Sequence, residues 1–315
     1  MTTKSILVFG ATGEIGGRIA RQCVDAGHRV TGVTRGANQR PSPDLSGVEL
    51  LQADKGEREC YTGTLAGRAF DVVIDSVPAA EHVTLAFEHF AGSIQHYLMC
   101  GSTGTFAPLQ YLPADENHPW REKTEVNFYH QSVRDAAALD LHARHGFPVA
   151  ILRPTNIIGP DRVPLELWGG RSPKYFRRML AHEAVEIPVC GNILVQSGYN
   201  DDLASAFVSA ASKGPEIDGE IFVISTRKAI TLDRYAEVAR DVLSSRSRVE
   251  VLPIEEIRQR YPDDVNAAGI RFLVEHMCFD LRKAERMLDY DPKFTAEQGL
   301  EQALKWCLDE GMFES

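Results

Sequence analysis

The sequence predicts an α/β fold in which a doubly wound parallel sheet carries helices on both faces and is followed by a smaller C-terminal α/β lobe. Short apolar runs alternate with amphipathic stretches through the first 155 residues, and this alternation is typical of parallel sheets covered by helices. A glycine-rich turn directly follows the first apolar run and opens the first helical stretch. Beyond residue 159, chain-breaking glycines and shorter elements replace the regular alternation, which indicates the second lobe.

The expected strands of the first half are short runs rich in Val, Ile, Leu and aromatic residues. Each is bounded by Gly, Asp or Pro, which is the pattern of a buried strand. They are residues 5–9, 29–33, 48–51, 71–75, 96–100 and 149–152.

Helical patterns fill most of the intervals between these strands, at residues 14–26, 79–91 and 125–145. The connection over residues 36–47 differs, because Pro41 and Pro43 prevent a regular helix, so we expect a surface loop there. In the second half we expect strands at 221–225 and 248–252. The helices expected there are residues 175–182, 201–212, 231–244 with Thr231 as N-cap, 281–288 and 295–308.

Composition and charge narrow the function classes. The chain has 34 basic and 44 acidic residues, a net charge of −10, and this balance repels a nucleic-acid backbone. No run of eighteen apolar residues is present, and we expect neither a signal peptide nor a membrane partner. The six cysteines occur singly without a CxxC pair, which favours a reduced, cytoplasmic protein without structural zinc or disulfides.

The glycine-rich turn has the spacing of a dinucleotide-binding motif. Glycines at positions 10, 13 and 16 allow a sharp turn, close approach of a diphosphate and tight packing of helix on strand. The N-terminus of the helix then faces the phosphates. The residues expected to contact the cofactor here are Gly10, Thr12, Gly13, Glu14, Ile15 and Gly16. We therefore expect a dinucleotide-binding domain over residues 1–160, which also receives parts of 196–230, and a mainly substrate-binding lobe over residues 161–315.

The end of the second strand indicates which dinucleotide is bound. NAD binders carry an acidic residue there to accept hydrogen bonds from the ribose, whereas this chain has Arg35, which can pair with a 2′-phosphate. Arg35 therefore favours NADP(H) over NAD(H), unless it is merely a solvated strand-end residue. Asp54 follows the third strand, where a carboxylate can reach the adenine amino group or remain a solvated loop residue.

Several segments together resemble the extended short-chain dehydrogenase/reductase family, the group of NAD(P)-dependent sugar epimerases, dehydratases and reductases. They are residues 10–16, 100–103, 145–160, 200–204, 222–225, 289–293 and 297–300. The resemblance covers nearly the whole length and implies a Rossmann-type fold with a homodimer formed through the helices at 79–91 and 125–145. It also implies that Pro154 and Asn156 lie beside the cofactor.

The family transfers protons with a Ser or Thr and a Tyr-x-x-x-Lys motif. Ser102 matches the hydroxyl position, with Thr103 as the neighbouring alternative, and the resemblance implies that it hydrogen-bonds the reacting oxygen. Counting back without a gap from residue 149 places Asn127 at the tyrosine position and Gln131 at the lysine position. Asn cannot cycle a proton as a phenol does, although Gln131 can still hydrogen-bond the nicotinamide ribose.

Two neighbouring side chains are alternatives for the missing phenol. Tyr129 lies roughly 200° around the helix from residue 127. His130 and Arg134 repeat the i, i+4 spacing only about 60° away, and a helix shorter by three residues brings them into register. An imidazole titrates near pH 6.5 and can exchange protons unaided. The remaining interpretation is that Tyr129 and His130 are ordinary surface or interface residues.

The substrate side departs from family members that bind nucleotide sugars. Those proteins often carry an arginine just before the helix at 201–212, and residues 194–199 contain none. Four basic residues, Arg171, Lys174, Arg177 and Arg178, instead offer a phosphate-neutralising cluster or a solvated helix face.

The favoured function is an atypical NADP(H)-dependent oxidoreductase, epimerase or dehydratase. It acts on a hydroxyl or keto carbon of a sugar-like or nucleotide-linked small molecule, with no metal. The alternative is an NAD(P)-binding protein without redox turnover, such as a regulatory or RNA-associated relative.

Overall fold

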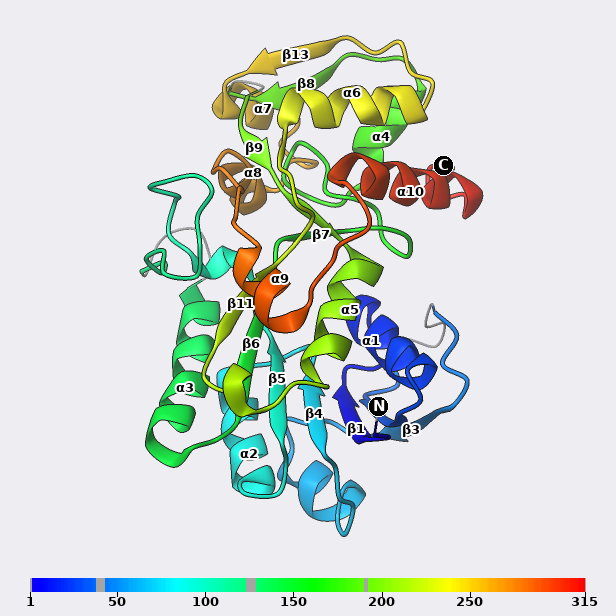
Figure 1. The fold of residues 1–315 in the computed structure, drawn as a ribbon. Coiled ribbons are helices and arrows are strands. Elements are labelled where there is room, and N and C mark those ends of the chain that lie inside the picture. The colour runs from blue at the N-terminus through cyan, green and yellow to red at the C-terminus, as the bar shows by residue number, and fades with distance from the viewer. Residues whose placement is uncertain (1, 38–42, 123–128, 190–191, 315) are drawn as a thin grey trace.

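A seven-stranded parallel sheet forms the centre of the computed structural model, which describes residues 2–37, 43–122, 129–189 and 192–314 (Figure 1). Its strands, in spatial order, are β11 (Ile221–Ile224), β6 (Val149–Pro154), β5 (His96–Cys100), β4 (Val72–Asp75), β1 (Ser5–Phe9), β2 (Arg29–Thr34) and β3 (Val48–Gln52). The strand order reverses between β1 and β4, and α/β sheets bind ligands beyond the carboxyl ends of their strands at such a point.

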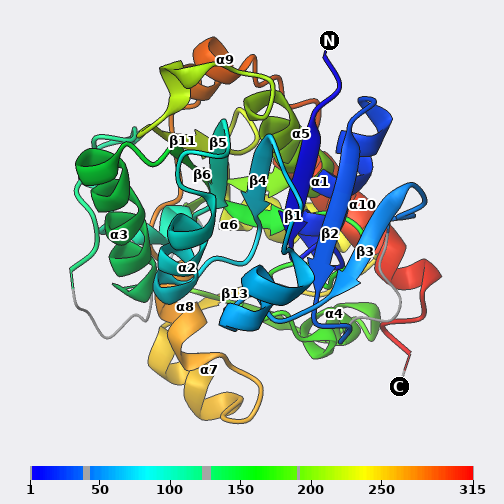
Figure 2. The same ribbon diagram turned by 90° about the horizontal axis from the view of Figure 1, so that it is seen from below.

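Helices cover both faces of this sheet, as Figure 2 shows. On one face α1 (Glu14–Asp25) packs against α5 (Asn200–Ala210), and on the other α2 (Ala80–Phe90) packs against α3 (Tyr129–His145). Alternate residues of β1 belong to two different hydrophobic clusters: Ile6 and Val8 to one, Leu7 and Phe9 to the other. Both faces of the strand are buried, which is why the strands read as continuous apolar runs.

The smaller lobe lies above the carboxyl ends of the large sheet in Figure 1. Its parallel strands are β8 (Val185–Pro188) and β13 (Val249–Leu252). Its helices are α4 (Pro173–Leu180), α6 (Leu232–Val242), α7 (Ile254–Arg260), α8 (Ala267–Leu273) and α10 (Ala296–Asp309). Two small pairs connect the lobes: β7 (Asn156–Ile158) with β10 (Ser197–Tyr199), and β9 (Leu194–Val195) with β12 (Ile230–Thr231).

The expected elements are present with small changes at their ends. Thr231 caps α6 by accepting a hydrogen bond from the Arg234 backbone N–H, as predicted. Helix α4 begins at Pro173, two residues earlier than expected, because Ser172 caps it and proline suits the first turn. The expected helix at 125–145 begins at Tyr129 within the described residues, and its first four residues lie outside them.

Several short elements were not predicted from the sequence. They are α7, α8, β7 to β10, β12 and the π-helical turn Cys60–Thr64. Each of the two helices has only seven residues. Helices of this length depend on tertiary packing rather than on their own helix propensity. Their sequences therefore show no clear helical pattern.

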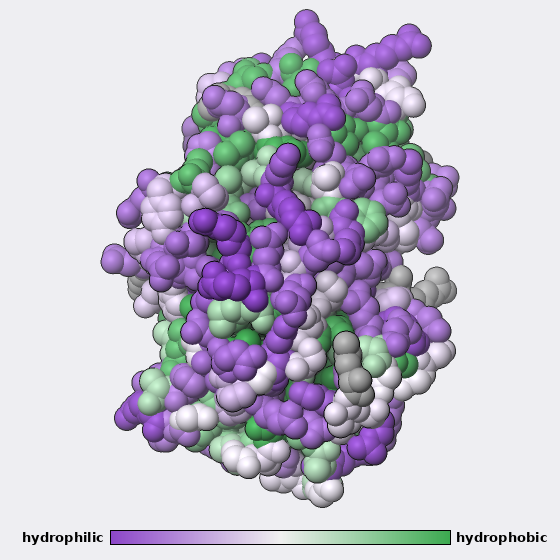
Figure 3. All heavy atoms as spheres, viewed as in Figure 1, coloured by the Kyte–Doolittle hydropathy of each residue, from purple (hydrophilic) through white to green (hydrophobic). Residues whose placement is uncertain are grey.

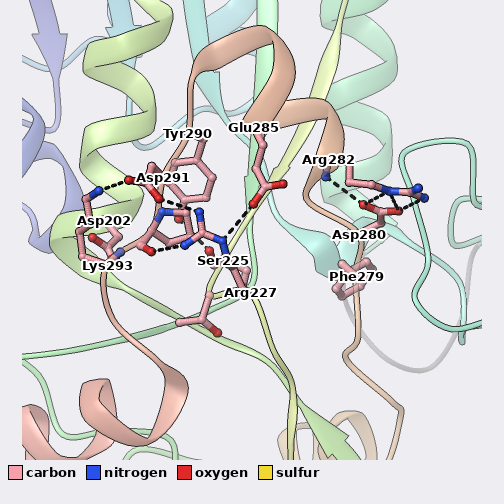
Figure 4. A network of polar contacts seen from close by, with 12 residues as sticks. Asp202, Ser225, Arg227, Phe279, Asp280, Arg282, Glu285, Tyr290, Asp291 and Lys293 are labelled. Carbon is pink, nitrogen blue, oxygen red and sulfur yellow. Dashed lines mark hydrogen bonds and ion pairs between the residues drawn. The ribbon is translucent and has the colours of Figure 1, made fainter.

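The segment after α9 (Arg282–Leu288) is fastened to the edge strand of the sheet, as Figure 4 shows. The Arg227 guanidinium, just beyond β11, forms ion pairs with Glu285 at 3.1 Å and Asp291 at 2.6 Å. The Tyr290 hydroxyl donates to the Ser225 carbonyl at 2.8 Å. These contacts link the C-terminal segment to the end of β11.

Hydrophilic side chains cover most of the face in Figure 3, with smaller groups of hydrophobic residues between them. Among the described residues, no helix is both long enough and apolar enough to cross a bilayer.

Candidate functional site

The glycine-rich turn connects β1 to α1 and has the backbone that the sequence predicts. Gly10 has a φ of +78°, which favours glycine, and a Cβ there would lie 2.5 Å from the Ser76 Oγ. A Cβ on Gly16 would lie 2.2 Å from the Gly10 carbonyl oxygen. No side chain caps the helix at Gly13, the N-cap of α1. The first N–H groups of this helix therefore suit an anion, and the turn fits the diphosphate of a dinucleotide.

A pocket of about 330 Å³ opens beside this turn, and we call it the glycine-turn pocket. The ends of β1, β2 and β3 and the segment after β4 contribute its walls. Of the residues expected to bind the cofactor, it contains Gly10, Thr12, Gly13, Arg35 and Asp54. The structure thus brings these five residues, from positions 10 to 54, together in one cavity at the switch point of the sheet. A more open depression of about 570 Å³, next to Arg227 and α9, contains none of the predicted site residues.

The pocket wall just beyond the end of β2 contains an accessible cation, the Arg35 side chain. Arg35 is exposed and forms no ion pair within the described part of the chain. Thr34 anchors the turn beside it, because its hydroxyl lies 2.8 Å from the Thr12 hydroxyl and accepts from the Gly36 N–H at 3.2 Å. The Arg35 side chain is therefore available to a phosphate at the pocket rim.

The floor of the pocket contains a charged residue that the sequence analysis missed. The Lys55 ammonium, 7% exposed, lies 2.5 Å from both oxygens of Asp75, which is itself 1% exposed. The Tyr97 hydroxyl donates to the same carboxylate at 2.7 Å. Burial lowers the pKa of Lys55, while the Asp75 carboxylate opposes this shift. The signal available in the sequence was an aspartate ending a buried strand together with a lysine just after another strand.

His82, at the first turn of α2, also lines the pocket and was missed as a site residue. Its Nδ1 atom is buried and has no hydrogen-bond partner among the described residues. Burial lowers the pKa of this imidazole, which favours its neutral form.

The candidate catalytic hydroxyls lie at the carboxyl end of β5. The Ser102 Oγ accepts a hydrogen bond from the Gly104 N–H at 3.0 Å, and the side chain is partly exposed. Thr103 is buried, and its hydroxyl faces the Pro154 carbonyl at 3.4 Å, at the end of β6. Ser102 is therefore the more accessible of the two hydroxyls.

Not all of the candidate proton-transfer residues lie within the described parts of the chain. Asn127 lies outside the described residues. Tyr129 and His130 are exposed at the start of α3, and their side chains make no hydrogen bond within the described part of the chain. Gln131 is half-buried, and its Oε1 has no partner there.

Arg134, which the three-residue slip would place at the lysine position, is buried. Its Nη2 lies 2.6 Å from the Asp135 carboxylate. The same carboxylate pairs with Arg153 of β6 at 2.9 Å, so Asp135 fastens α3 to the sheet.

The predicted basic cluster on the substrate side separates into individual contacts. Lys174 pairs with Asp264 and Arg178 with Glu183, while Arg177 reaches the carbonyl of Glu314. The fourth member, Arg171, contacts β7, where its Nη2 donates to Asn156 Oδ1 at 2.9 Å.

Comparisons with known proteins agree with this architecture. Residues 83–225 match the NAD dependent epimerase/dehydratase family, and residues 2–99 match the NmrA-like family. The chain is 27% identical over 326 residues to the chloroplast stem-loop binding protein of 41 kDa b from Arabidopsis thaliana, covering 98% of this chain and 81% of that protein.

Solved structures share the fold over nearly the full length. The UDP-glucose 4-epimerase of Thermotoga maritima, solved with UDP-glucose, has a TM-score of 0.76 at 17% identity, covering 97% of this chain and 99% of that chain. The UDP-glucuronic acid 4-epimerase of Bacillus cereus, solved with UDP-glucuronic acid and NAD, has a TM-score of 0.76 at 16% identity, covering 97% and 99%.

The Rossmann-type fold expected from the sequence is thus confirmed, and so is the family resemblance. The chain is thus similar to the NAD dependent epimerase/dehydratase family over residues 83–225 and to the NmrA-like family over residues 2–99, and it shares its fold with solved epimerases.

Proposed function

We propose that this protein is an atypical NADP(H)-dependent oxidoreductase, epimerase or dehydratase. Its substrate is a sugar-like or nucleotide-linked small molecule that reacts at a hydroxyl or keto carbon. The observation that carries the proposal is the glycine-turn pocket, which opens at the switch point of the sheet. The accessible hydroxyl of Ser102 lies two residues beyond the end of β5, the strand next to β4.

Arg35 and the glycine turn hold the cofactor in this proposal. The uncapped N-terminus of α1 binds the diphosphate, and Arg35 binds a 2′-phosphate, which selects NADP(H). Glu14 and Ile15 contribute as the first residues of that helix, and Asp54 is available to the adenine amino group. When bound, the nicotinamide supplies the hydride chemistry.

Ser102 acts on the reacting oxygen of the substrate. Because its Oγ already accepts from the Gly104 N–H, the hydroxyl proton remains free to be donated. A donor aimed at an oxygen that gains negative charge stabilises the transition state. Thr103 is the less accessible alternative, since its hydroxyl faces the Pro154 carbonyl.

Gln131 and a neighbouring titratable group replace the phenol and lysine of the family in this proposal. The unpartnered Oε1 of Gln131 suits a ribose hydroxyl, which donates to it. His130 is the preferred proton donor and acceptor, and Tyr129 is the alternative. We also propose a homodimer through α2 and α3, where Tyr129 and Val133 of α3 are exposed hydrophobic residues.

The test is turnover on defined substrates. The purified chain is incubated with NADP⁺ or NAD⁺ and with UDP-glucose or UDP-glucuronic acid, and products are separated by chromatography with absorbance at 340 nm as a second readout. Conversion of either sugar nucleotide supports the proposal. Tight cofactor binding without conversion of these or of free sugars argues for the non-redox alternative.

That alternative, a cofactor-binding protein associated with RNA, has one specific observation in its favour. The relative from Arabidopsis thaliana, with 27% identity, is named as a stem-loop binding protein. The net charge of −10 counts against it. Titration of a fluorescent RNA stem-loop at several salt concentrations distinguishes the two, because phosphate contacts give binding that falls steeply with salt.

A further inference from the structure

A second cavity lies away from the glycine-turn pocket. It is the open depression of about 570 Å³ next to α9, and we call it the α9 depression. Among the residues that the structure describes, the two cavities share no lining residue. The walls come from Pro113, the end of β9, the turn after β11 and residues 278–285. The volume of the depression is within the range of cavities that bind small molecules.

Hydrogen bonds hold the walls of the α9 depression in place. The Gln196 amide, just after β9, donates to the Thr226 carbonyl at 2.6 Å and accepts from the Phe279 N–H at 2.6 Å. The Ala114 N–H donates to the Cys278 carbonyl at 2.9 Å. Because the walls are already ordered, a ligand that binds there spends little free energy on ordering the protein.

The floor of the depression is mostly apolar. Phe279 and Leu281 are each 5% exposed, and Leu194 and Ala229 are partly exposed. The Cys278 thiol also belongs to the lining, and burial raises its pKa, so the thiol carries no charge at neutral pH. Such a floor favours a ligand with an apolar body, because binding removes the surface of that body from water.

Two ion pairs stand at the rim, and Figure 4 shows them apart from each other. Near the middle of that view, Arg227 pairs with Glu285 at 3.1 Å. On its right, the Arg282 Nε donates to the Asp280 carboxylate at 2.7 Å. Both carboxylates in the described lining are therefore already paired with an arginine.

Lys228 is the other charged residue of the described lining. Its side chain is exposed, and within the described part of the chain it forms no ion pair. The lining therefore has three basic and two acidic side chains, on a chain whose net charge is −10. A local excess of positive charge attracts an anion, and Lys228 is the cation available to it.

We propose that the α9 depression binds a small organic monoanion, such as an aromatic carboxylate. The apolar body of the ligand lies on the floor formed by Leu194, Ala229 and Phe279, and its anionic group contacts Lys228. The site is separate from the glycine-turn pocket, so the chain can hold this ligand and NADP(H) at the same time. The proposal does not depend on the proposed function.

The test uses two fluorescent probes that differ in charge. Anilinonaphthalene sulfonate is an aromatic monoanion, and N-phenylnaphthylamine is its uncharged counterpart. Both are titrated with saturating NADP⁺, which keeps them out of the glycine-turn pocket. Lys228→Gln is expected to weaken binding of the sulfonate roughly twofold to fivefold, as for an exposed ion pair, and to leave the affinity for the amine unchanged. Added salt is expected to weaken binding of the sulfonate alone.

Two further variants locate the probes. Lys305→Gln is the matched control, because it removes the same charge from a different open depression, between α6 and α10. Its affinities are expected to match the wild type. Ala229→Phe fills the floor of the α9 depression and is expected to weaken both probes by about tenfold or more, because the apolar body loses its contacts.

The proposal is supported if Lys228→Gln weakens the sulfonate, Lys305→Gln does not, and Ala229→Phe weakens both probes. It is wrong if the wild type does not bind the sulfonate, if Lys228→Gln leaves that affinity unchanged, or if Lys305→Gln causes the larger loss. Should Ala229→Phe fail to fold by circular dichroism, the Lys228 variant and the two probes decide alone. The readouts compare variants, so a chain that binds no NADP⁺ contradicts the proposed function and leaves this test intact.

Discussion

The Lys55 ammonium contacts both carboxylate oxygens of Asp75 at 2.5 Å beneath the glycine-turn pocket, where both side chains are buried. The pair joins the segment after β3 to the end of β4, and the Tyr97 hydroxyl adds a contact from β5. Residues from β5, from the end of β4 and from the segment after β3 thus meet at one carboxylate.

Replacing Lys55 by Met is expected to lower the free energy of unfolding by about 3–5 kcal/mol, because it leaves the buried Asp75 charge unpaired. Urea denaturation measures the change. Lys305→Met is the matched control, since the Lys305–Glu301 pair is exposed and such pairs contribute only about 0–1 kcal/mol. A loss below about 1 kcal/mol for Lys55→Met would contradict the buried pairing.

Arg35→Ser is expected to remove the selectivity for NADPH. Charge-assisted contacts to a 2′-phosphate contribute about 1.5–3 kcal/mol, which corresponds to a tenfold to hundredfold preference over NADH. Calorimetric titration of both cofactors into the wild type and the variant measures it. Arg29→Ser, at the other end of β2, serves as the control. Equal affinities for the two cofactors in the wild type would refute the assignment to Arg35.

Ser102→Ala is expected to lower turnover by about 10²–10³ with little change in cofactor affinity, because one donor to developing oxygen charge is lost. Steady-state kinetics on the substrate measures kcat, and calorimetry measures cofactor binding. Thr103→Val is the companion variant. If Thr103→Val is inactive while Ser102→Ala retains full turnover, the Thr103 hydroxyl is the group that donates to the reacting oxygen.

His130→Ala is expected to remove most of the rate, because it removes the group that we propose to transfer the proton. Tyr129→Phe is expected to have little effect. The opposite result, an inactive Tyr129→Phe and an active His130→Ala, would show that the phenol transfers the proton. If neither substitution changes the rate, the proton comes from another group.

Glu166 makes the stability of the chain depend on pH. Burial raises its pKa from 4.5 to about 7, so between these values the folded state retains a proton that the unfolded state has lost. The contribution of this group to the free energy of unfolding therefore falls as pH rises from 4.5 to 7, by about 3 kcal/mol for such a shift.

The glutamine side chain of the Glu166→Gln variant cannot ionise. The variant therefore lacks the fall in the free energy of unfolding that Glu166 causes as pH rises. Relative to the wild type, the variant is expected to gain about 3 kcal/mol on going from pH 5 to pH 8, measured by urea denaturation at both values. A stability difference between the two proteins that is independent of pH would show that the carboxyl group titrates normally.

The sequence by itself determined those elements whose structure depends on residues close together in the chain. The β1–turn–α1 unit was readable because its strand, glycines and helix are contiguous, and Gly10 must adopt a positive φ that other residues disfavour. The caps at Ser172 and Thr231 likewise bond within three residues of themselves. The inner strands β1, β4, β5 and β6 of the large sheet were readable because both their faces are buried, which requires apolar runs.

The tertiary structure alone decided which distant side chains meet. Lys55 and Asp75 are twenty residues apart, and their contact depends on β4 lying beside β1, not on any local pattern. Arg171 reaches Asn156 only because the buried Glu166 carboxylate and the tightly packed Gly169 fix the intervening loop. Local geometry is set by backbone sterics and short-range hydrogen bonds, whereas these long-range contacts arise from packing, which no short stretch of sequence encodes.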